Sequence, residues 1–457
     1  MSDTPSNRSN VVWILSDQHR AQALGWNGDV NLSTPAIDNL ARSGVVFTNA
    51  VAGTPWCTPF RSALLTGMYP HQNGCARAPS RLDPRHKTVA HAFANAGYHT
   101  AWVGKWHLGG SNSPDHVVPV GERGGFDYWR GYENNNKQND VWVYGGESEE
   151  PERLPDYETR SLSRVFLSHL EQQVSAHPEQ PFFGVLSVQP PHSPYVPPHD
   201  STVRSPATVN LRPNVPVSPR VQEKAKRDIA GYSAMVEEVD RMVAEVWVGL
   251  TKLGVDRETY IIYLSDHGDM LGSHGQWEKS SPWEESIRIP FVIGCTGSHA
   301  HIQTGAVDYP LNHVDIAPTT LGLCGIETPA DMVGYDFSAQ VVHTSRRFPM
   351  HESAPAGQPE SAKPPESALL QQIPRKFHPN SVNRAWRGVV TRDGWKYVCT
   401  PGNDWLMFDL NDDPFEMNNL CYNTVFQAQK ERLHAELSRL LEETGDDFAL
   451  PAIALER

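Results

Sequence analysis

Residues 57–67 read Cys57-Thr58-Pro59-Phe60-Arg61-Ser62-Ala63-Leu64-Leu65-Thr66-Gly67. The stretch is typical of the start of a helix that runs into residues 62–65. A helix start offers unpaired N–H groups and the positive end of the helix dipole, and both favour an anion. The stretch therefore places Cys57 at the start of a helix, a position that favours an anion.

On either side of this stretch, strand-like and helix-like segments alternate. Strands are predicted at residues 11–15, 98–103, 182–188 and 260–264. Thr34-Pro35 is typical of a helix start and Gly44 of its end. A long amphipathic helix is predicted at residues 222–253, because its apolar positions recur every three or four residues. Such alternation predicts an α/β fold with a mostly parallel sheet and helices on both faces.

The last quarter of the chain has a different pattern. Residues 349–379 are rich in Pro, Ser, Ala and Glu and are predicted to be a long connection. A hairpin is predicted from residues 387–391 and 395–399, which flank Asp393-Gly394, and a helix at residues 425–443. We therefore divide the chain into a catalytic domain at 1–348, a Pro-rich connection or lid at 349–380, and a small C-terminal subdomain at 381–457.

Composition narrows the class of partner. The chain has 457 residues and a formal net charge of −14, which argues against nucleic acid or an anionic membrane as the main partner. No apolar stretch at the start resembles a signal peptide, so we expect a cytoplasmic protein. None of the six cysteines forms a Cys-x-x-Cys pair, and a reducing compartment disfavours disulfides.

Polar residues follow each predicted strand of the large domain. They are Asp17 after the first strand, Lys105 and His107 after the second, His192 after the third, and Asp266 and His267 after the fourth. In open α/β sheets, ligands bind outside the carboxyl ends of the strands. If these strands are parallel neighbours, the side chains face one crevice.

Two of these strand ends resemble each other, Ile14-Leu15-Ser16-Asp17 and Tyr263-Leu264-Ser265-Asp266. Two carboxylates in one crevice repel each other unless a cation lies between them. We therefore predict a metal held by Asp17 and Asp266, with His267 as a further candidate ligand. Oxygen ligands favour Ca²⁺, Mg²⁺ or Mn²⁺. The residues alone thus indicate a metal-dependent hydrolase of an anionic ester.

The stretch at 57–67 resembles the signature of the type I sulfatases, Cys-x-Pro-x-Arg followed by four residues and Thr-Gly. Other blocks resemble the same family in the same order, namely Gly104-Lys105-Trp106-His107-Leu108-Gly109, Pro191-His192, Ser265-Asp266-His267-Gly268-Asp269 and Lys279. The resemblance implies the alkaline phosphatase fold, a large α/β/α sandwich with a smaller C-terminal antiparallel sheet and a helix.

In that family the motif cysteine is oxidised to formylglycine by a maturation enzyme, which implies the same for Cys57. The hydrated aldehyde attacks sulfur with one hydroxyl and expels sulfate with the other. The remaining roles implied by the resemblance are metal ligation by Asp17, Asp266, His267 and residue 57, support of the diol by Arg61, neutralisation of sulfate by Lys105 and Lys279, sulfate release by His107, and protonation of the leaving alcohol by His192.

The chain departs from many sulfatases in having Asp17-Gln18 and Asp266-His267. This combination resembles the branch with choline sulfatases and phosphonate monoester hydrolases. It leaves open whether Gln18 is a ligand, and it makes Mn²⁺ a competitor to Ca²⁺. A phosphonate monoester or phosphodiester hydrolase is the alternative activity, and a sulfate-binding pseudoenzyme is a third hypothesis. The expected substrate is a small-molecule sulfate ester, either of a sugar or of a small alcohol. Candidate specificity loops are 112–140, 201–216 and 349–379.

Overall fold

The computed structural model describes residues 8–255, 259–295, 302–342, 363–373 and 381–452. The strands are β1 (Asn10–Asp17), β2 (Val45–Phe47), β3 (His99–Lys105), β4 (Tyr128–Tyr132), β5 (Trp142–Gly145), β6 (Ser148–Arg153), β7 (Phe182–Pro191), β8 (Thr259–Ser265), β9 (Phe291–Cys295), β10 (Gly305–Val307), β11 (Ser367–Gln372), β12 (Trp386–Thr391), β13 (Trp395–Thr400) and β14 (Asn403–Asp409). The helices are α1 (Pro35–Arg42), α2 (Cys57–Thr66), α3 (Pro70–Asn73), α4 (Val89–Asn95), α5 (Glu158–Ala176), α6 (Pro219–Lys252), α7 (Glu284–Ile287), α8 (Ile316–Leu323), α9 (Ser338–Val341) and α10 (Gln427–Thr444).

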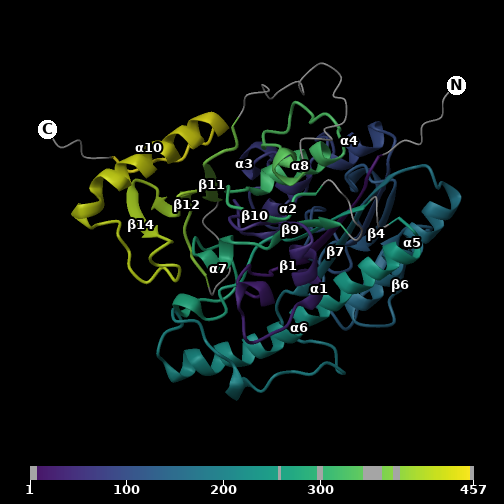
Figure 1. The fold of residues 1–457 in the computed structure, drawn as a ribbon, viewed down its shortest axis with the longest axis horizontal. Coiled ribbons are helices and arrows are strands. Elements are labelled where there is room, and N and C mark those ends of the chain that lie inside the picture. Colours follow the sequence, from purple (N-terminus) through teal and green to yellow (C-terminus); the bar gives the residue numbers. More distant parts are fainter. Residues whose placement is uncertain (1–7, 256–258, 296–301, 343–362, 374–380, 453–457) are drawn as a thin grey trace.

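These strands form two sheets. The large sheet has the order β10-β2-β9-β8-β1-β7-β3-β4-β5-β6, and the small sheet has the order β11-β12-β13-β14. In Figure 1, α1, α5 and α6 lie on one side of the large sheet and α3, α4 and α8 on the other, while the small sheet and α10 lie at one end. This confirms the predicted α/β/α sandwich with a smaller C-terminal antiparallel sheet.

The centre of the large sheet is parallel. Strands β8, β1, β7, β3 and β4 are parallel neighbours, while β9 runs antiparallel to β8, and β5 to β4. The four strands predicted from the sequence are all in this parallel centre. Their carboxyl ends therefore meet at one edge of the sheet, which is the condition for the polar residues at these ends to face one crevice.

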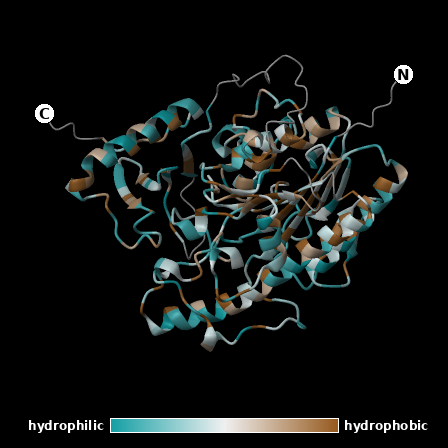
Figure 2. Ribbon diagram, viewed as in Figure 1, coloured by the Kyte–Doolittle hydropathy of each residue, from teal (hydrophilic) through white to brown (hydrophobic). Residues whose placement is uncertain are grey.

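The alternation of side chains along β1 builds a core on each face of the sheet. Val11, Trp13 and Leu15 pack with residues of α2, α4 and α8, and Val12 and Ile14 pack with residues of α1, α5 and α6. All five side chains are fully buried, and each contributes roughly 1.5–3 kcal/mol through burial. In Figure 2 the central strands are largely brown or white, whereas the helices carry both brown and teal residues.

The C-terminal sheet confirms one prediction and corrects another. The predicted hairpin is present as β12 and β13, which pair antiparallel. However, β11 (Ser367–Gln372) falls inside the segment predicted to be a connection, and all six of its residues are buried. The Pro- and Ser-rich composition of the surrounding residues hid a short apolar run. The rest of that segment lies mostly outside the described residues.

Helix α6 extends for 34 residues, close to the predicted 222–253. Among the described residues, however, no helix combines the length and the apolar character that crossing a membrane requires.

Candidate active site

The cysteine of the signature opens a buried helix. Cys57 is the first residue of α2, Trp56 before it is extended, and Gly67 ends the helix in the left-handed conformation. All ten residues of α2 are buried, and Cys57 itself is 2% exposed. The apolar side of α2 packs on the large sheet through Phe60 and Leu64. The helix therefore presents its N-terminus, with Cys57, at the edge where the parallel strands end.

Four potential metal ligands meet around this cysteine. Asp17, Cys57, Asp266 and His267 each offer one ligand atom, and these atoms all lie within 4.8 Å of one another. Cys57 Sγ lies 3.1 Å from His267 Nε2 and 3.7 Å from Asp17 Oδ1. His267 Nδ1 lies 3.0 Å from the Gly268 carbonyl oxygen. If Nδ1 donates its proton there, the Nε2 lone pair faces the cluster. The structure thus brings together all four residues predicted to bind the metal.

Two buried cations neutralise the carboxylates. Arg61 Nε donates to Asp266 Oδ2 at 3.1 Å, and its NH2 group donates to Asp17 Oδ2 at 3.2 Å. Lys105 Nζ donates to the same Asp17 oxygen at 2.6 Å. Lys105 reaches this position because Gly104 precedes it with φ 104, where a Cβ would stand 1.9 Å from the Ser187 carbonyl oxygen. Glycine is therefore needed for β3 to approach β7 this closely.

The ionisation of these groups follows from burial and from their charged neighbours. Burial alone would raise the pKa of Asp17, but Lys105, His192 and Arg61 outweigh it and hold this pKa well below its ordinary value. Burial and the charge of Asp17 raise the pKa of Asp266. Burial and then Asp17 also raise the pKa of the Cys57 thiol to about 12. An unmodified Cys57 is therefore a neutral thiol at neutral pH and a poor nucleophile.

A second buried group lies around Lys279. Its Nζ contacts Gln18 Oε1 at 2.5 Å and His192 Nε2 at 2.6 Å. Gln18 Nε2 in turn donates to Asp269 Oδ2 at 2.5 Å. Both ends of the Gln18 amide are thus occupied, and its oxygen faces Lys279. In this structure Gln18 is a partner of Lys279 and Asp269, and whether it also binds the metal stays open.

The orientation of His192 bears on its predicted role as an acid. Its Nδ1 lies 2.6 Å from the Ser193 carbonyl oxygen, so Nδ1 carries the proton and Nε2 accepts from Lys279. Burial and the charge of Lys279 lower the pKa of His192 well below its ordinary value. Before substrate binds, the transferable proton of this pair therefore belongs to Lys279.

His107 is held at the same edge in a left-handed conformation with φ 58. Its backbone N–H donates to the Glu133 carbonyl at 2.8 Å, and its own carbonyl accepts from Thr58 Oγ1 at 3.0 Å. Neither ring nitrogen meets strict hydrogen-bond geometry with a described residue, although the Asn112 side chain lies close enough to interact with the ring. Burial and then Lys105 lower the pKa of His107 well below its ordinary value. The neutral ring is therefore able to accept a proton.

Sequence reasoning missed two residues behind this site. Asp269 accepts from Gln18 and also from Tyr195 Oη at 2.5 Å. Asp269 stands in a motif that the sequence analysis quoted, three residues after Asp266, but no role was given to it. Tyr195 carried no sequence signal, because it lies 74 positions from Asp269.

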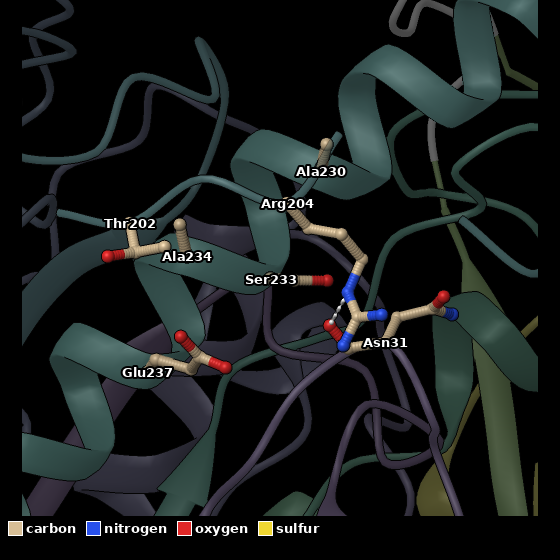
Figure 3. Close-up of a pocket in the computed structure, with 7 residues that line it drawn as sticks. All are labelled: Asn31, Thr202, Arg204, Ala230, Ser233, Ala234 and Glu237. Carbon is tan, nitrogen blue, oxygen red and sulfur yellow. Dashed lines mark hydrogen bonds between the residues drawn. The ribbon is translucent and has the colours of Figure 1, made fainter. Parts of the chain in front are cut away.

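The structure describes parts of the predicted specificity loops, whose role stays a prediction. Loop 112–140 contains β4, which is part of the core sheet. Two residues of loop 201–216, Thr202 and Arg204, line a cavity of about 280 Å³ together with residues of α6 (Figure 3). None of the metal-ligand candidates or proposed catalytic residues lines this cavity. Most of loop 349–379 lies outside the described residues.

Comparison with known proteins agrees with the geometry. A sequence model of the sulfatase family matches residues 9–326. An ulvan-active sulfatase of Formosa agariphila is 33% identical over 451 residues, covering 98% of this chain and 83% of the relative. A solved structure from work on glycosaminoglycan metabolism by Bacteroides thetaiotaomicron has a TM-score of 0.81 at 26% identity, covering 96% of this chain and 97% of the other. The phosphonate monoester hydrolase of Agrobacterium radiobacter has a TM-score of 0.73 at 21% identity, covering 96% of each chain, and shares the fold.

The fold and the site thus define a hydrolase of the alkaline phosphatase-like class. The chain belongs to the sulfatase family, and its activity is that of a sulfuric ester hydrolase.

Proposed function

We propose that this sulfatase uses a formylglycine made from Cys57 and one divalent metal to hydrolyse the sulfate ester of a carbohydrate. The observation that carries the proposal is the position of Cys57 among Asp17, Asp266 and His267 at the start of a buried helix. With a thiol pKa of about 12, the unmodified residue has little thiolate to offer. A hydrated aldehyde at the same position offers hydroxyl groups instead.

The donor set fits a divalent metal. Two carboxylates, an imidazole nitrogen and the side chain of residue 57 converge in a fully buried space. The two carboxylates favour Ca²⁺, and the imidazole keeps Mn²⁺ and Mg²⁺ as alternatives. When bound, the metal supplies positive charge that polarises the sulfate and favours ionisation of the diol.

The protein residues handle the protons and the developing charge. One diol hydroxyl gives up its proton to solvent and attacks sulfur, the bond from sulfur to the alcohol oxygen breaks, and that oxygen takes a proton from Lys279 of the Lys279–His192 pair. The second hydroxyl then gives its proton to His107, its electrons form the aldehyde C=O bond, and the carbon–oxygen bond to sulfate breaks. Lys105 and Lys279 offset the negative charge of the sulfate group.

The carbohydrate part of the proposal rests on the relatives. The Formosa enzyme is named for activity on ulvan, and the Bacteroides structure comes from glycosaminoglycan metabolism. Phosphonate monoester or phosphodiester hydrolysis is the second candidate, supported by the shared fold of the Agrobacterium enzyme and by the Asp-Gln and Asp-His pairs.

The test is a parallel assay of the aldehyde-bearing enzyme on sulfated oligosaccharides, aryl sulfate, a phosphonate monoester and a phosphodiester. We expect the highest kcat/KM on a sulfated saccharide. A higher kcat/KM on the phosphonate would replace the proposed function with the alternative.

Two further parts of the proposal concern maturation and location. A formylglycine-generating enzyme would act on Cys57, so the mass of the active protein should fall below its sequence mass, with the difference in the peptide that contains Cys57. The cytoplasmic location stays a prediction. Cell fractionation would test it.

A further inference from the structure

The segment from Glu278 to Arg288 connects several loops of the active site. Its backbone accepts hydrogen bonds from residues that follow Asp17 or Asp266 and from one that precedes Cys57. The donors and acceptors are Ala21 N to Arg288 O, Ala52 N to Ile287 O, Gly268 N to Ser286 O, and Met270 N to Glu278 O, at 2.8–3.1 Å. In addition, Ser280 N donates to the Pro55 carbonyl at 3.0 Å. The same segment carries Lys279, so any displacement of its backbone moves a sulfate-binding cation relative to Cys57.

The backbone around Lys279 is strained. Glu278 and Ser280, on either side of it, both have φ 67. This left-handed conformation is unfavourable for residues with a side chain, and it persists only where the surroundings enforce it. The local sequence has no glycine at either position, so the enforcement has to come from tertiary contacts.

The C-terminal subdomain supplies contacts to three carbonyl groups of this segment, two of them from its sheet and one from the residues before β12. Ser381 Oγ donates to the Lys279 carbonyl, and Trp386 Nε1 donates to the Ser280 carbonyl at 3.2 Å. Lys396 Nζ, from β13, donates to the Pro282 carbonyl at 2.8 Å. The small subdomain thus contacts the strained segment directly, in addition to the contact that Ser280 makes with Pro55.

Of the three contacts, the one from Lys396 costs the most free energy of desolvation, because it buries a charged ammonium group. The Lys396 side chain is fully buried, and its ammonium group also contacts Glu284 Oε1 at 3.0 Å and Glu416. Glu416 Oε2 accepts from the Glu284 backbone N–H at 2.8 Å, which fixes the start of α7. A buried ion pair is weak evidence for stabilisation, since replacing it with apolar residues is often neutral. The role of this ion pair is therefore better explained by the geometry that it imposes on the segment.

A metal is not needed to explain this cluster. Glu285, Glu416 and His274 do bring ligand atoms within 4.8 Å of one another. However, Lys396 already pairs with Glu416, and Arg212 Nε pairs with Glu285 at 2.9 Å. The positive charge that these carboxylates require is therefore supplied by side chains.

We propose that the C-terminal sheet positions Lys279 for catalysis, and that Lys396 is a positioning residue that acts through the 279–282 backbone. This inference rests on the proposed sulfatase function, in which Lys279 neutralises the sulfate and supplies a proton. It gives the small subdomain a role in the rate of the reaction in addition to stability.

The main test is Lys396→Met in the full-length, metal-loaded, aldehyde-bearing enzyme. We expect kcat on aryl sulfate to fall by about 10–100-fold, because a shift of about 1 Å in a catalytic group has effects of this size. Metal affinity measured by calorimetry should stay within about twofold, because the four ligands lie elsewhere. Lys396→Arg should recover part of kcat, since it keeps the cation and the donors. The matched control is Lys430→Met, which removes the ion pair with Asp404 in the same subdomain and should leave kcat unchanged.

A double-mutant cycle separates positioning from general destabilisation. If Lys396 acts through Lys279, Lys396→Met should cause little further loss of kcat/KM in a Lys279→Ala background. Equal losses in both backgrounds, or an unchanged kcat in folded Lys396→Met, would overturn the inference. Inactive parent enzyme would instead overturn the proposed function.

A second variant covers the case in which Lys396→Met does not fold. Ser381→Ala with Trp386→Phe removes two of the three carbonyl contacts and leaves no unpaired buried charge. We expect this pair to lower kcat by about 3–10-fold, on the same positioning argument, and to be non-additive with Lys279→Ala. A parent-like kcat would contradict the proposal.

Discussion

The strand ends Leu15-Ser16-Asp17-Gln18 and Leu264-Ser265-Asp266-His267 are nearly the same in sequence but differ in their electrostatics. Strands β1 and β8 pair in parallel with Leu15 opposite Leu264 and Ser16 opposite Ser265. Asp17 nevertheless receives two cations, Lys105 and Arg61. Asp266 receives Arg61 and the backbone N–H of Gln18 at 3.1 Å. The difference arises because β1 stands nearer than β8 to β3, which carries Lys105.

The residues that follow the two aspartates also diverge. His267 directs Nε2 toward Cys57. Gln18, with φ 70, directs its amide toward Lys279 and Asp269. One strand end therefore adds a metal-ligand candidate, and the other holds Lys279, the cation that we propose neutralises the sulfate. The comparison teaches that a repeated local motif receives its chemistry from the position of its strand in the sheet.

The largest effect is expected at residue 57, where the two strand ends meet. Cys57→Ser should lower multiple turnover by at least about 10³-fold, because a serine sulfate has no second hydroxyl to expel the sulfate. The metal should still bind to Asp17 and Asp266. Steady-state kinetics and calorimetry measure the two properties. Turnover near the parent rate would exclude a formylglycine mechanism.

The next effect tests the asymmetry of the two aspartates in the metal-free protein. Asp17→Asn leaves Lys105 and one side of Arg61 buried without their carboxylate, which costs about 3–5 kcal/mol. Asp266→Asn removes the partner of Arg61 only, and Arg61 keeps Asp17. We expect Asp17→Asn to be the more destabilising change by about 2 kcal/mol, on the same basis. Urea unfolding in chelator gives both values, and equal losses would show that Lys105 adds nothing.

Much of this site could be predicted, because most of its residues stand in short sequence patterns. Asp17, Asp266 and His267 each follow a buried strand, and the parallel sheet brings them together without any further information. Cys57 and Arg61 stand in a motif with fixed spacing on one helix. By contrast, the direction of the Gln18 side chain depends on Asp269 and Lys279, which are more than 240 positions away. Lys396 and Pro282 are likewise 114 positions apart.

The elements of the fold also differ in how well the local sequence predicts them. The parallel strands and α6 were predicted because their apolar patterns are long. Strand β11 was missed because six residues carry little pattern against a Pro-rich background. Its place in the sheet comes from pairing with β12, which a sequence does not record locally.

A smaller effect tests the residues after the aspartates. His267→Ala should weaken metal binding by about 10–100-fold, the range seen when a ligand or its support is lost. Gln18→Ala should leave metal affinity nearly unchanged and should lower kcat instead, because Lys279 loses its fixed partner. Calorimetric titration with Ca²⁺ and steady-state kinetics on both variants measure the difference. Weaker metal binding in Gln18→Ala would identify Gln18 as a ligand.

The smallest effect concerns a third buried carboxylate, Glu158, which sharpens the contrast with Asp17. Within the described ranges Glu158 contacts no cation, and its Oε1 accepts from Tyr132 Oη at 2.5 Å and Gln189 N at 2.6 Å. Burial raises its pKa to about 7 from the ordinary 4.5. The folded state therefore holds a proton that the unfolded state releases, and this contribution to stability declines as the pH rises from about 4.5 to about 7.

Glu158→Gln should remove this decline while keeping an oxygen for Tyr132 and Gln189. Relative to the parent, the variant should gain about 2–3 kcal/mol in unfolding free energy between pH 5 and pH 7.5, since each pKa unit is worth about 1.4 kcal/mol. Urea unfolding at the two pH values, with metal concentration held constant, measures the gain. Asp17 has its pKa lowered by cations, so Asp17→Asn should not show a relative gain over this range. Parallel stability curves for Glu158→Gln and the parent would mean that Glu158 is already ionised at pH 5, and that a buried carboxylate without a cation is tolerated beside this site.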